Sequence, residues 1–223
     1  PNFLRRHPDF ARYWTGMAFE SIAVQIEAVT IGWQIYTVSR QTLSIEQSAF
    51  MVGMVGLAQF APLFLLTLWA GSLADRHSRR AIVLGSILLK VVGVLGLVAV
   101  ALEPSPTLWH IFAIAALFGV SRAFLSPAAS ALTPMLVPKA YMPQAISLKS
   151  LSWQVSVILG PWIGGLLCAW STALAYAVAA SLYFGTIAIV LLLRTNTTPE
   201  RQPGSPWQQI KEGLIYTYQN KII

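Results

Sequence analysis

The sequence predicts an all-α membrane protein with six transmembrane helices. Charged residues make up only 10% of the chain and hydrophobic residues 56%, whereas charged residues are about 25% of an ordinary soluble domain. Several runs without charge reach the roughly 20 apolar residues that an α-helix needs to cross a bilayer core. Most of the basic residues lie in the terminal segments and in the short connectors between these runs. We therefore expect a lipid bilayer to surround most of this chain.

The six spans follow one another with short connectors. The last uncharged run, 150–193, is too long for one crossing and long enough for two, with a hairpin expected at 169–172. The fifth span then begins upstream of this run, near Met142. In order, the predicted spans are about 11–39, 47–70, 80–102, 107–136, 142–169 and 172–193.

The distribution of Lys and Arg predicts the orientation of these spans. The N-terminal segment, the second and fourth connectors and the C-terminal segment together hold twelve of the fifteen basic residues, whereas the odd connectors hold only Arg40. Loops rich in Lys and Arg stay on the cytoplasmic side of a membrane. We therefore expect both termini to be cytoplasmic.

The segment after Arg194 changes character. Residues 195–206 are polar and rich in proline, which is typical of a linker. Residues 207–223 place apolar side chains at helical spacing beside Lys211 and Glu212, which predicts an amphipathic helix on the cytoplasmic surface of the membrane.

Composition also excludes several function classes. The net charge of +7 is spread over connectors instead of forming one solvated face, so nucleic-acid binding is not expected. Cys168 is the only cysteine, which excludes an internal disulfide and a thiolate metal cluster. No phosphate-binding loop, metal site or nucleophilic triad stands out, so we expect neither a cofactor nor an enzyme.

The connector between the second and third spans, residues 71–80, carries the most specific motif. It resembles the cytoplasmic signature loop of the major facilitator superfamily, with Ser78 in place of a usual glycine. The resemblance implies that Asp75 caps a helix of a second half of the protein and pairs with nearby arginines, as a latch. The alternative is a basic loop that only sets topology. The matching residues are Gly71, Leu73, Ala74, Asp75, Arg76, Arg79 and Arg80.

The fifth span carries small residues at four-residue spacing around a proline, a pattern that allows two helices to approach closely. It resembles a motif of proton-coupled exporters of the same superfamily, with Ser156 where glycine is usual. Tight packing alone is the alternative interpretation. The residues concerned are Ser156, Gly160, Pro161, Gly164 and Gly165.

The strings Gly119–Pro127 and Gly32–Tyr36 are similar to those of the exporter branch that includes bacterial siderophore and macrolide efflux proteins. The resemblance implies that residues 1–194 are the N-terminal half of a twelve-helix fold, built as two inverted three-helix repeats. It further implies a bacterial inner-membrane transporter that exports small amphiphilic molecules in exchange for protons by alternating access. The expected partners are the bilayer, the substrate, protons and a second six-helix half. The alternative is a truncated or stand-alone six-helix module that does not transport and needs a partner half or a second copy.

Three charges inside the spans are the candidate site for protons and substrate. Glu20 and Glu27 are seven residues apart and so share one helix face. Glu20 lies roughly 12 Å beyond Arg12, and Arg122 falls at a similar depth, roughly 20 Å from the other side, so the two can pair. Charges inside a membrane are costly, which favours a functional role, although a static ion pair is the alternative for Glu20. For Lys90, in the third span, we expect a snorkelling or packing role.

Overall fold

The computed structural model describes residues 3–74 and 76–195, and this part of the chain is helical without strands, as predicted. The helices are joined by short turns. Their bounds are α1 Phe3–Arg6, α2 Pro8–Ser39, α3 Ile45–Ala74, α4 Arg79–Leu102, α5 Leu108–Leu136, η1 Lys139–Tyr141, α6 Met142–Trp170 and α7 Thr172–Leu191. Apart from Thr195, the linker predicted for 195–206 and the amphipathic helix predicted for 207–223 lie outside the described residues.

Serine side chains begin two of the long helices. Ser78 accepts a hydrogen bond from the Ala81 backbone N–H at 3.5 Å and caps α4 with a negative φ of −54°. The position where related loops carry glycine therefore needs no left-handed backbone here. Ser171 accepts from the Leu174 N–H at 3.4 Å and caps α7, so the predicted hairpin between the last two spans turns at this one residue.

Five of the described helices, α3 to α7, are long and apolar enough to cross a membrane. The longest of the described helices, α2, has 32 residues but is not apolar enough to count as a candidate membrane span. Glu20, Glu27 and Gln34 lie in its interior and lower its hydropathy. The prediction of helices at all six positions is confirmed, and the crossing by α2 stays a prediction.

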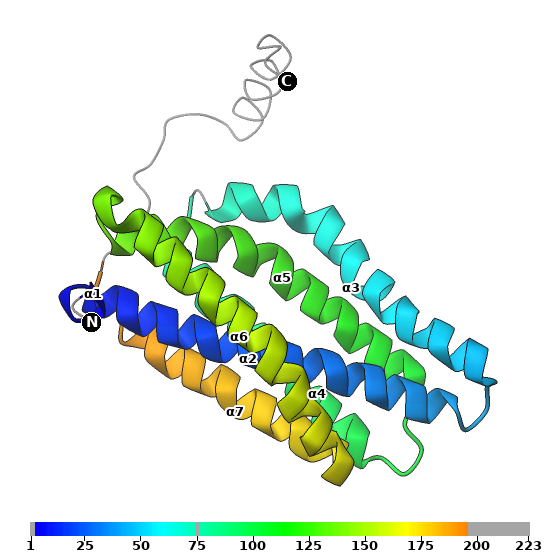
Figure 1. The fold of residues 1–223 in the computed structure, drawn as a ribbon. Coiled ribbons are helices and arrows are strands. Elements are labelled where there is room, and N and C mark those ends of the chain that lie inside the picture. The colour runs from blue at the N-terminus through cyan, green and yellow to red at the C-terminus, as the bar shows by residue number, and fades with distance from the viewer. Residues whose placement is uncertain (1–2, 75, 196–223) are drawn as a thin grey trace, which may run out of the picture.

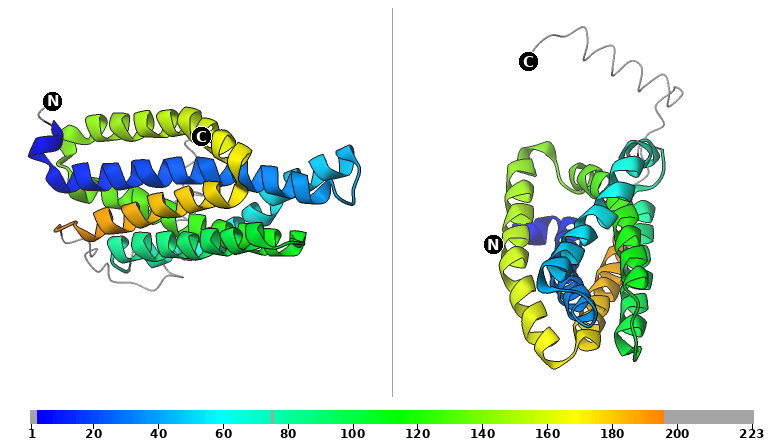
Figure 2. Two further views of the ribbon diagram at one scale, coloured as in Figure 1. Left: turned by 90° about the horizontal axis from the view of Figure 1, so that it is seen from below. Right: turned by 90° about the vertical axis from the view of Figure 1, so that its right-hand side faces the viewer.

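The long helices lie alongside one another in a bundle (Figures 1 and 2). α2 packs against α6 and α7, α5 packs against α3 and α4, and α4 packs against α7. Both ends of the described chain meet at the same end of the bundle, where the Thr195 hydroxyl donates to Asp9 at 2.6 Å.

The outward faces of α3 and α6 carry large apolar side chains that the bundle does not cover. Leu68 and Trp69 of α3 are 75% and 73% exposed, and Ile158 and Trp162 of α6 are 71% and 65% exposed. A soluble domain rarely exposes so continuous an apolar surface. These faces therefore fit lipid or another apolar helix.

Candidate functional site

One face of α2 presents a polar side chain every seventh residue, Tyr13, Glu20, Glu27 and Gln34. Seven residues are close to two turns of an α-helix, so the four side chains lie in one row. All four are buried, and the two acids are only 7% and 5% exposed. We call this row the polar ladder.

The two acids of the polar ladder have partners on two other helices. Lys90 Nζ of α4 donates to Glu20 Oε1 in a buried ion pair. The Tyr183 hydroxyl of α7 donates to Glu27 Oε2 at 2.6 Å. Lys90 Nζ also lies 5.5 Å from the centre of the Tyr183 ring, within reach of a cation–π interaction. Tyr183 is therefore the hydrogen-bond partner of Glu27 and also lies beside Lys90, the partner of Glu20.

Tyr13 and Gln34, at the two ends of the polar ladder, also have hydrogen-bond partners. The Tyr13 hydroxyl donates to the Ala129 carbonyl of α5 at 2.7 Å, and the Tyr176 hydroxyl of α7 donates to Gln34 Oε1 at 2.8 Å. Tyr176 and Tyr183 are themselves seven residues apart on α7. The ladder thus ties α2 to α4, α5 and α7 through buried side chains.

The expected pairing of Glu20 with Arg122 is wrong, because Glu20 pairs with Lys90. Of the two roles expected for Lys90, snorkelling is wrong and packing is not contradicted, because Lys90 is only 4% exposed. Depth alone does not decide between the two bases, because both lie near the level of Glu20. The helix faces decide it: Lys90 is buried in the bundle, whereas Arg122 is exposed. Arg122 is exposed on α5, and no described carboxylate pairs with it. The three predicted residues are therefore not brought together.

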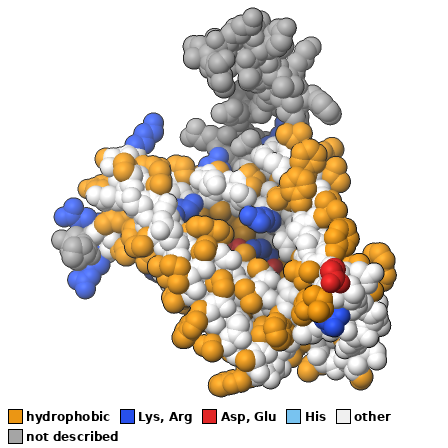
Figure 3. Space-filling model, turned by 45° about the vertical axis from the view of Figure 1, so that its right-hand side comes forward, with side chains coloured by type: hydrophobic (Ala, Val, Ile, Leu, Met, Phe, Trp, Pro, Cys, Tyr) orange, Lys and Arg blue, Asp and Glu red, His pale blue; other side chains and the backbone are white. Residues whose placement is uncertain are grey.

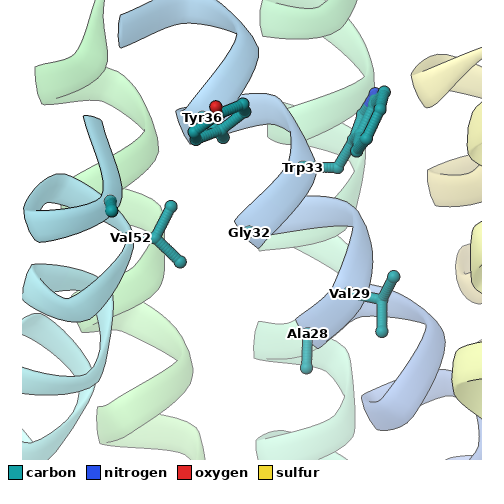
Figure 4. Close-up of a pocket in the computed structure, with 7 residues that line it drawn as sticks. Ala28, Val29, Gly32, Trp33, Tyr36 and Val52 are labelled. Atoms are coloured by element: carbon teal, nitrogen blue, oxygen red, sulfur yellow. The ribbon is translucent and has the colours of Figure 1, made fainter. Parts of the chain in front are cut away.

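The molecule has a hollow on the face shown in Figure 3, with basic and acidic side chains in its depth and apolar side chains around it. A separate apolar pocket of about 400 Å³ lies between α2 and α3. Trp33, Tyr36 and Val52 are among the residues that line it, and Figure 4 shows Tyr36 and Val52 on its two sides. α2 thus presents its polar ladder to α4 and α7, and an aromatic, apolar surface to α3.

The signature loop contacts the ends of other helices. Gly71, Leu73 and Ala74 form the last turn of α3. Arg79 donates to the Ala131 carbonyl of α5 at 3.0 Å. Arg80 donates to the carbonyls of Leu191 and Leu193 at 2.6 and 2.8 Å, where the end of α7 favours a positive charge. Arg76 is exposed, and Asp75 lies outside the described residues, so the latch stays a prediction.

A third acid, Asp9, joins the beginning of α2 to the residues after α7, a contact that the sequence did not predict. Asp9 Oδ2 accepts hydrogen bonds from the backbone N–H groups of Arg194 and Thr195 and from the Thr195 hydroxyl, and Asp9 Oδ1 accepts from Arg12 at 2.8 Å. Burial raises the pKa of the Asp9 carboxyl, but these hydrogen bonds outweigh it, so the pKa lies below its ordinary value. We call these four residues the Asp9 cluster.

The motif of α6 is a close contact with α2. A Cβ atom on Gly160 would lie 2.3 Å from Gln25 Cβ, and one on Gly164 would lie 3.2 Å from Ile26 Cα. Gly165 faces open space. Pro161 lies within α6, and the buried Ser156 hydroxyl donates to the Ser152 carbonyl at 2.8 Å. The predicted close approach is confirmed at Gly160 and Gly164, and a role in proton exchange stays a prediction.

The sequence pattern of a family described as transmembrane secretion effector, within the major facilitator superfamily, matches residues 4–223. The chain belongs to this family. Among similar proteins are the enterobactin exporters EntS of Shigella boydii serotype 18 and of Escherichia coli O1:K1, each 26% identical over 223 residues. The alignment covers 100% of this chain and 52% of each exporter, so the chain spans about half the length of these relatives.

Solved structures confirm the fold class at low sequence identity. A peptide transporter POT in complex with sulfate superposes with a TM-score of 0.69 and 17% identity, over 95% of this chain and 44% of that chain. A POT family transporter in complex with a thioalcohol-conjugated peptide gives a TM-score of 0.65 and 15% identity, over 94% and 44%. The fold is that of the major facilitator superfamily, and these relatives are transporters and not enzymes, as the sequence predicts.

Proposed function

We propose that this protein is a secondary active transporter that exports small amphiphilic organic molecules in exchange for protons. The observation that carries the proposal is the pair of buried acids, Glu20 and Glu27, inside an apolar helical bundle. Ionisable groups at such positions are costly and mark proton or substrate pathways. The similarity to exporters of enterobactin and the apolar surfaces support siderophores and drug-like amphiphiles as candidate substrates.

The two faces of α2 suit two different tasks. Glu20 and Glu27 face other side chains of the bundle and are the candidate proton sites. Trp33 and Tyr36 line an apolar pocket, and Arg122 is exposed on α5 with hydrogen-bond donors that can bind acceptor groups of a substrate. We propose that protons and substrate occupy separate positions in this half.

The arrangement of the helices supports six crossings built as two inverted repeats. Exchange of α2–α4 with α5–α7 maps the contact of α3 with α5 onto that of α6 with α2, and the contact of α2 with α7 onto that of α5 with α4. Both ends of the described chain lie at one end of the bundle, as an even number of crossings requires. We propose that this end is cytoplasmic and that the membrane is a bacterial inner membrane.

Alternating access requires a second six-helix half that moves against this one. The relatives are about twice as long as the aligned chain, and the exposed faces of α3 and α6 are apolar. We propose that Asp75 and the adjacent arginines form a gate with that half. The alternative function is a six-helix module that does not transport until a partner half or a second copy joins it.

The test is proton-driven efflux in everted vesicles that contain the full-length protein, measured over a panel of siderophores, enterobactin included, and amphiphilic drugs. We expect the wild-type protein to export at least one of them, and Glu27→Gln to abolish the pH dependence of the rate. Glu103→Gln, which changes an exposed acid beyond the end of α4, is the matched control and should keep that dependence. Flux with an unchanged pH profile in Glu27→Gln would assign Glu27 to packing. The absence of flux for the whole panel would favour the non-transporting module.

A further inference from the structure

The buried charges of α2 and α4 do not balance. Glu20, Glu27 and Lys90 are 7%, 5% and 4% exposed, so two acids share the interior with one base. If all three were ionised, the interior would hold one uncompensated negative charge. Burial of such a charge costs several kcal/mol unless a partner or a proton neutralises it. The composition of this group therefore requires one additional positive charge.

The contacts indicate which acid lacks a counter-charge. Lys90 Nζ contacts Glu20 Oε1 directly, so the base of the group is matched to Glu20. Glu27 receives instead the neutral hydroxyl of Tyr183. The titratable and charged groups that face Glu27 are Tyr183 and Tyr176 from α7, Lys90 from α4 and Glu20 from α2 itself. Glu27 is therefore the acid whose charge remains to be neutralised.

Tyr183 connects the two acids. Its hydroxyl donates to Glu27 at 2.6 Å, and its ring lies 5.5 Å from Lys90 Nζ. A change of charge at Glu27 therefore acts on the Lys90–Glu20 pair through one intervening side chain, in an interior where charges are poorly screened.

We infer that Glu20, Lys90, Tyr183 and Glu27 are one proton-binding unit, which holds a single exchangeable proton on Glu27. The Glu27 carboxylate accepts one proton to become a carboxylic acid, and the charge of the unit changes from −1 to 0. Lys90 and Tyr183 are positioning residues: Lys90 neutralises Glu20, and Tyr183 orients the Glu27 carboxyl. This inference deepens the proposed function, on which it rests only for the direction in which the proton then travels.

The charge balance predicts the number of protons that each variant holds. The wild-type unit holds one proton. Glu27→Gln and Glu20→Gln each leave one acid opposite Lys90 and therefore hold none. Lys90→Met leaves two acids without a base and holds two, whereas the double variant Glu20→Gln/Lys90→Met returns to one. Tyr183→Phe keeps one proton in a changed hydrogen-bonding environment.

The experiment is infrared difference spectroscopy between alkaline and acidic buffer, on the purified full-length protein in lipid, read at the stretching band of protonated carboxyl groups. We expect one buried-carboxyl band in the wild type, its loss in Glu27→Gln and in Glu20→Gln, and about twice its amplitude in Lys90→Met, since each unpaired buried acid takes up one proton. In Tyr183→Phe the band should shift in frequency at constant amplitude. Gly85→Ala, on the same helix as Lys90 but where a Cβ atom meets open space, is the control and should reproduce the wild-type band.

A band that survives in Glu27→Gln, or the absence of a band from the wild type, would overturn the inference. If Lys90→Met does not fold, the double variant still tests the charge balance, since loss of its band would contradict the predicted single proton. The measurement needs no substrate and no transport. Flux without the band would refute the proton-binding unit and leave transport standing, and the band without flux would refute transport and leave the unit standing.

Discussion

The polar ladder and the Asp9 cluster both use acids to join helices, yet they differ in what those acids contact. In the ladder, Glu20 and Glu27 contact side chains, an ammonium and a phenol, deep in the bundle. In the cluster, Asp9 contacts mainly backbone N–H groups and a hydroxyl near the end of the bundle, with Arg12 beside it. The ladder joins the middles of α2, α4 and α7, whereas the cluster joins the beginning of α2 to the end of α7.

This difference separates a site whose protonation can change from a contact whose charge is fixed. Backbone N–H groups do not titrate, and they are present whatever the sequence, so the Asp9 cluster has one charge state over the neutral range. Lysine and tyrosine partners carry protons of their own, and the buried charges around the polar ladder are two acids, Glu20 and Glu27, against one base, Lys90. A region with an unbalanced buried charge can bind a proton that neutralises it. A region whose acid is bound by backbone N–H groups has no such unbalanced charge.

The largest effect should follow from Lys90→Met, which removes the basic side chain that pairs with Glu20 of the polar ladder. Glu20 would lose the one charged partner that it has among the described residues, and removal of one partner of a buried ion pair costs about 3–5 kcal/mol of stability. We expect a fall of this size in the free energy of unfolding, measured by reversible unfolding in mixed micelles.

The matched control for Lys90→Met is the double variant Glu20→Gln/Lys90→Met, in which the charge without a partner is removed as well. It should recover most of the lost stability, because two neutral groups can occupy the site without a buried charge. If the double variant is as unstable as the single one, Lys90 acts through its aliphatic stem and not through its charge.

A smaller effect should follow from Gly160→Ala, which tests whether α6 holds the polar ladder in place from the far side of α2. The new Cβ atom would meet Gln25 Cβ at 2.3 Å, so α2 and α6 must separate. Overpacking of this kind costs about 1–3 kcal/mol. We expect a loss of stability in the same unfolding assay and a shift of the Glu27 carboxyl band. Gly165→Ala is the control on the same helix, and an equal loss there would show that helix propensity and not contact is responsible.

The sequence predicted the helices and the close contact of α6 far better than it predicted the charged site. Long apolar runs are local signals, so every long helix was found within a few residues of its bounds. The snorkelling role expected for Lys90 was wrong, because its burial depends on how the helices pack together. The seven-residue spacing of Tyr13, Glu20, Glu27 and Gln34 was already present in the sequence, but depth does not tell Lys90 from Arg122 as the partner of Glu20.

The Asp9 cluster could not be predicted from residue types and their spacing. Its partners are the backbone N–H groups of Arg194 and the backbone and hydroxyl of Thr195, more than 180 residues away in the chain. Any residue supplies a backbone N–H, so no residue type marks the contact. Only the packing of α2 against α7, which brings the two ends together, determines it.

The smallest effect should follow from Asp9→Asn, which removes the charge of the Asp9 cluster but keeps an acceptor oxygen. The pKa of Asp9 is lower in the folded state than its ordinary value of 3.8, because hydrogen bonds outweigh burial. The charge therefore stabilises the fold above that value, and the stabilisation is lost as the pH falls through the folded pKa. We expect Asp9→Asn to cost no more than about 1 kcal/mol at neutral pH, and the difference from wild type to vanish in acid, measured as unfolding free energy against pH. Glu103→Gln, at an exposed acid, should differ little from wild type at any pH. A difference for Asp9→Asn that persists unchanged in acid would mean that the cluster depends on shape and not on charge.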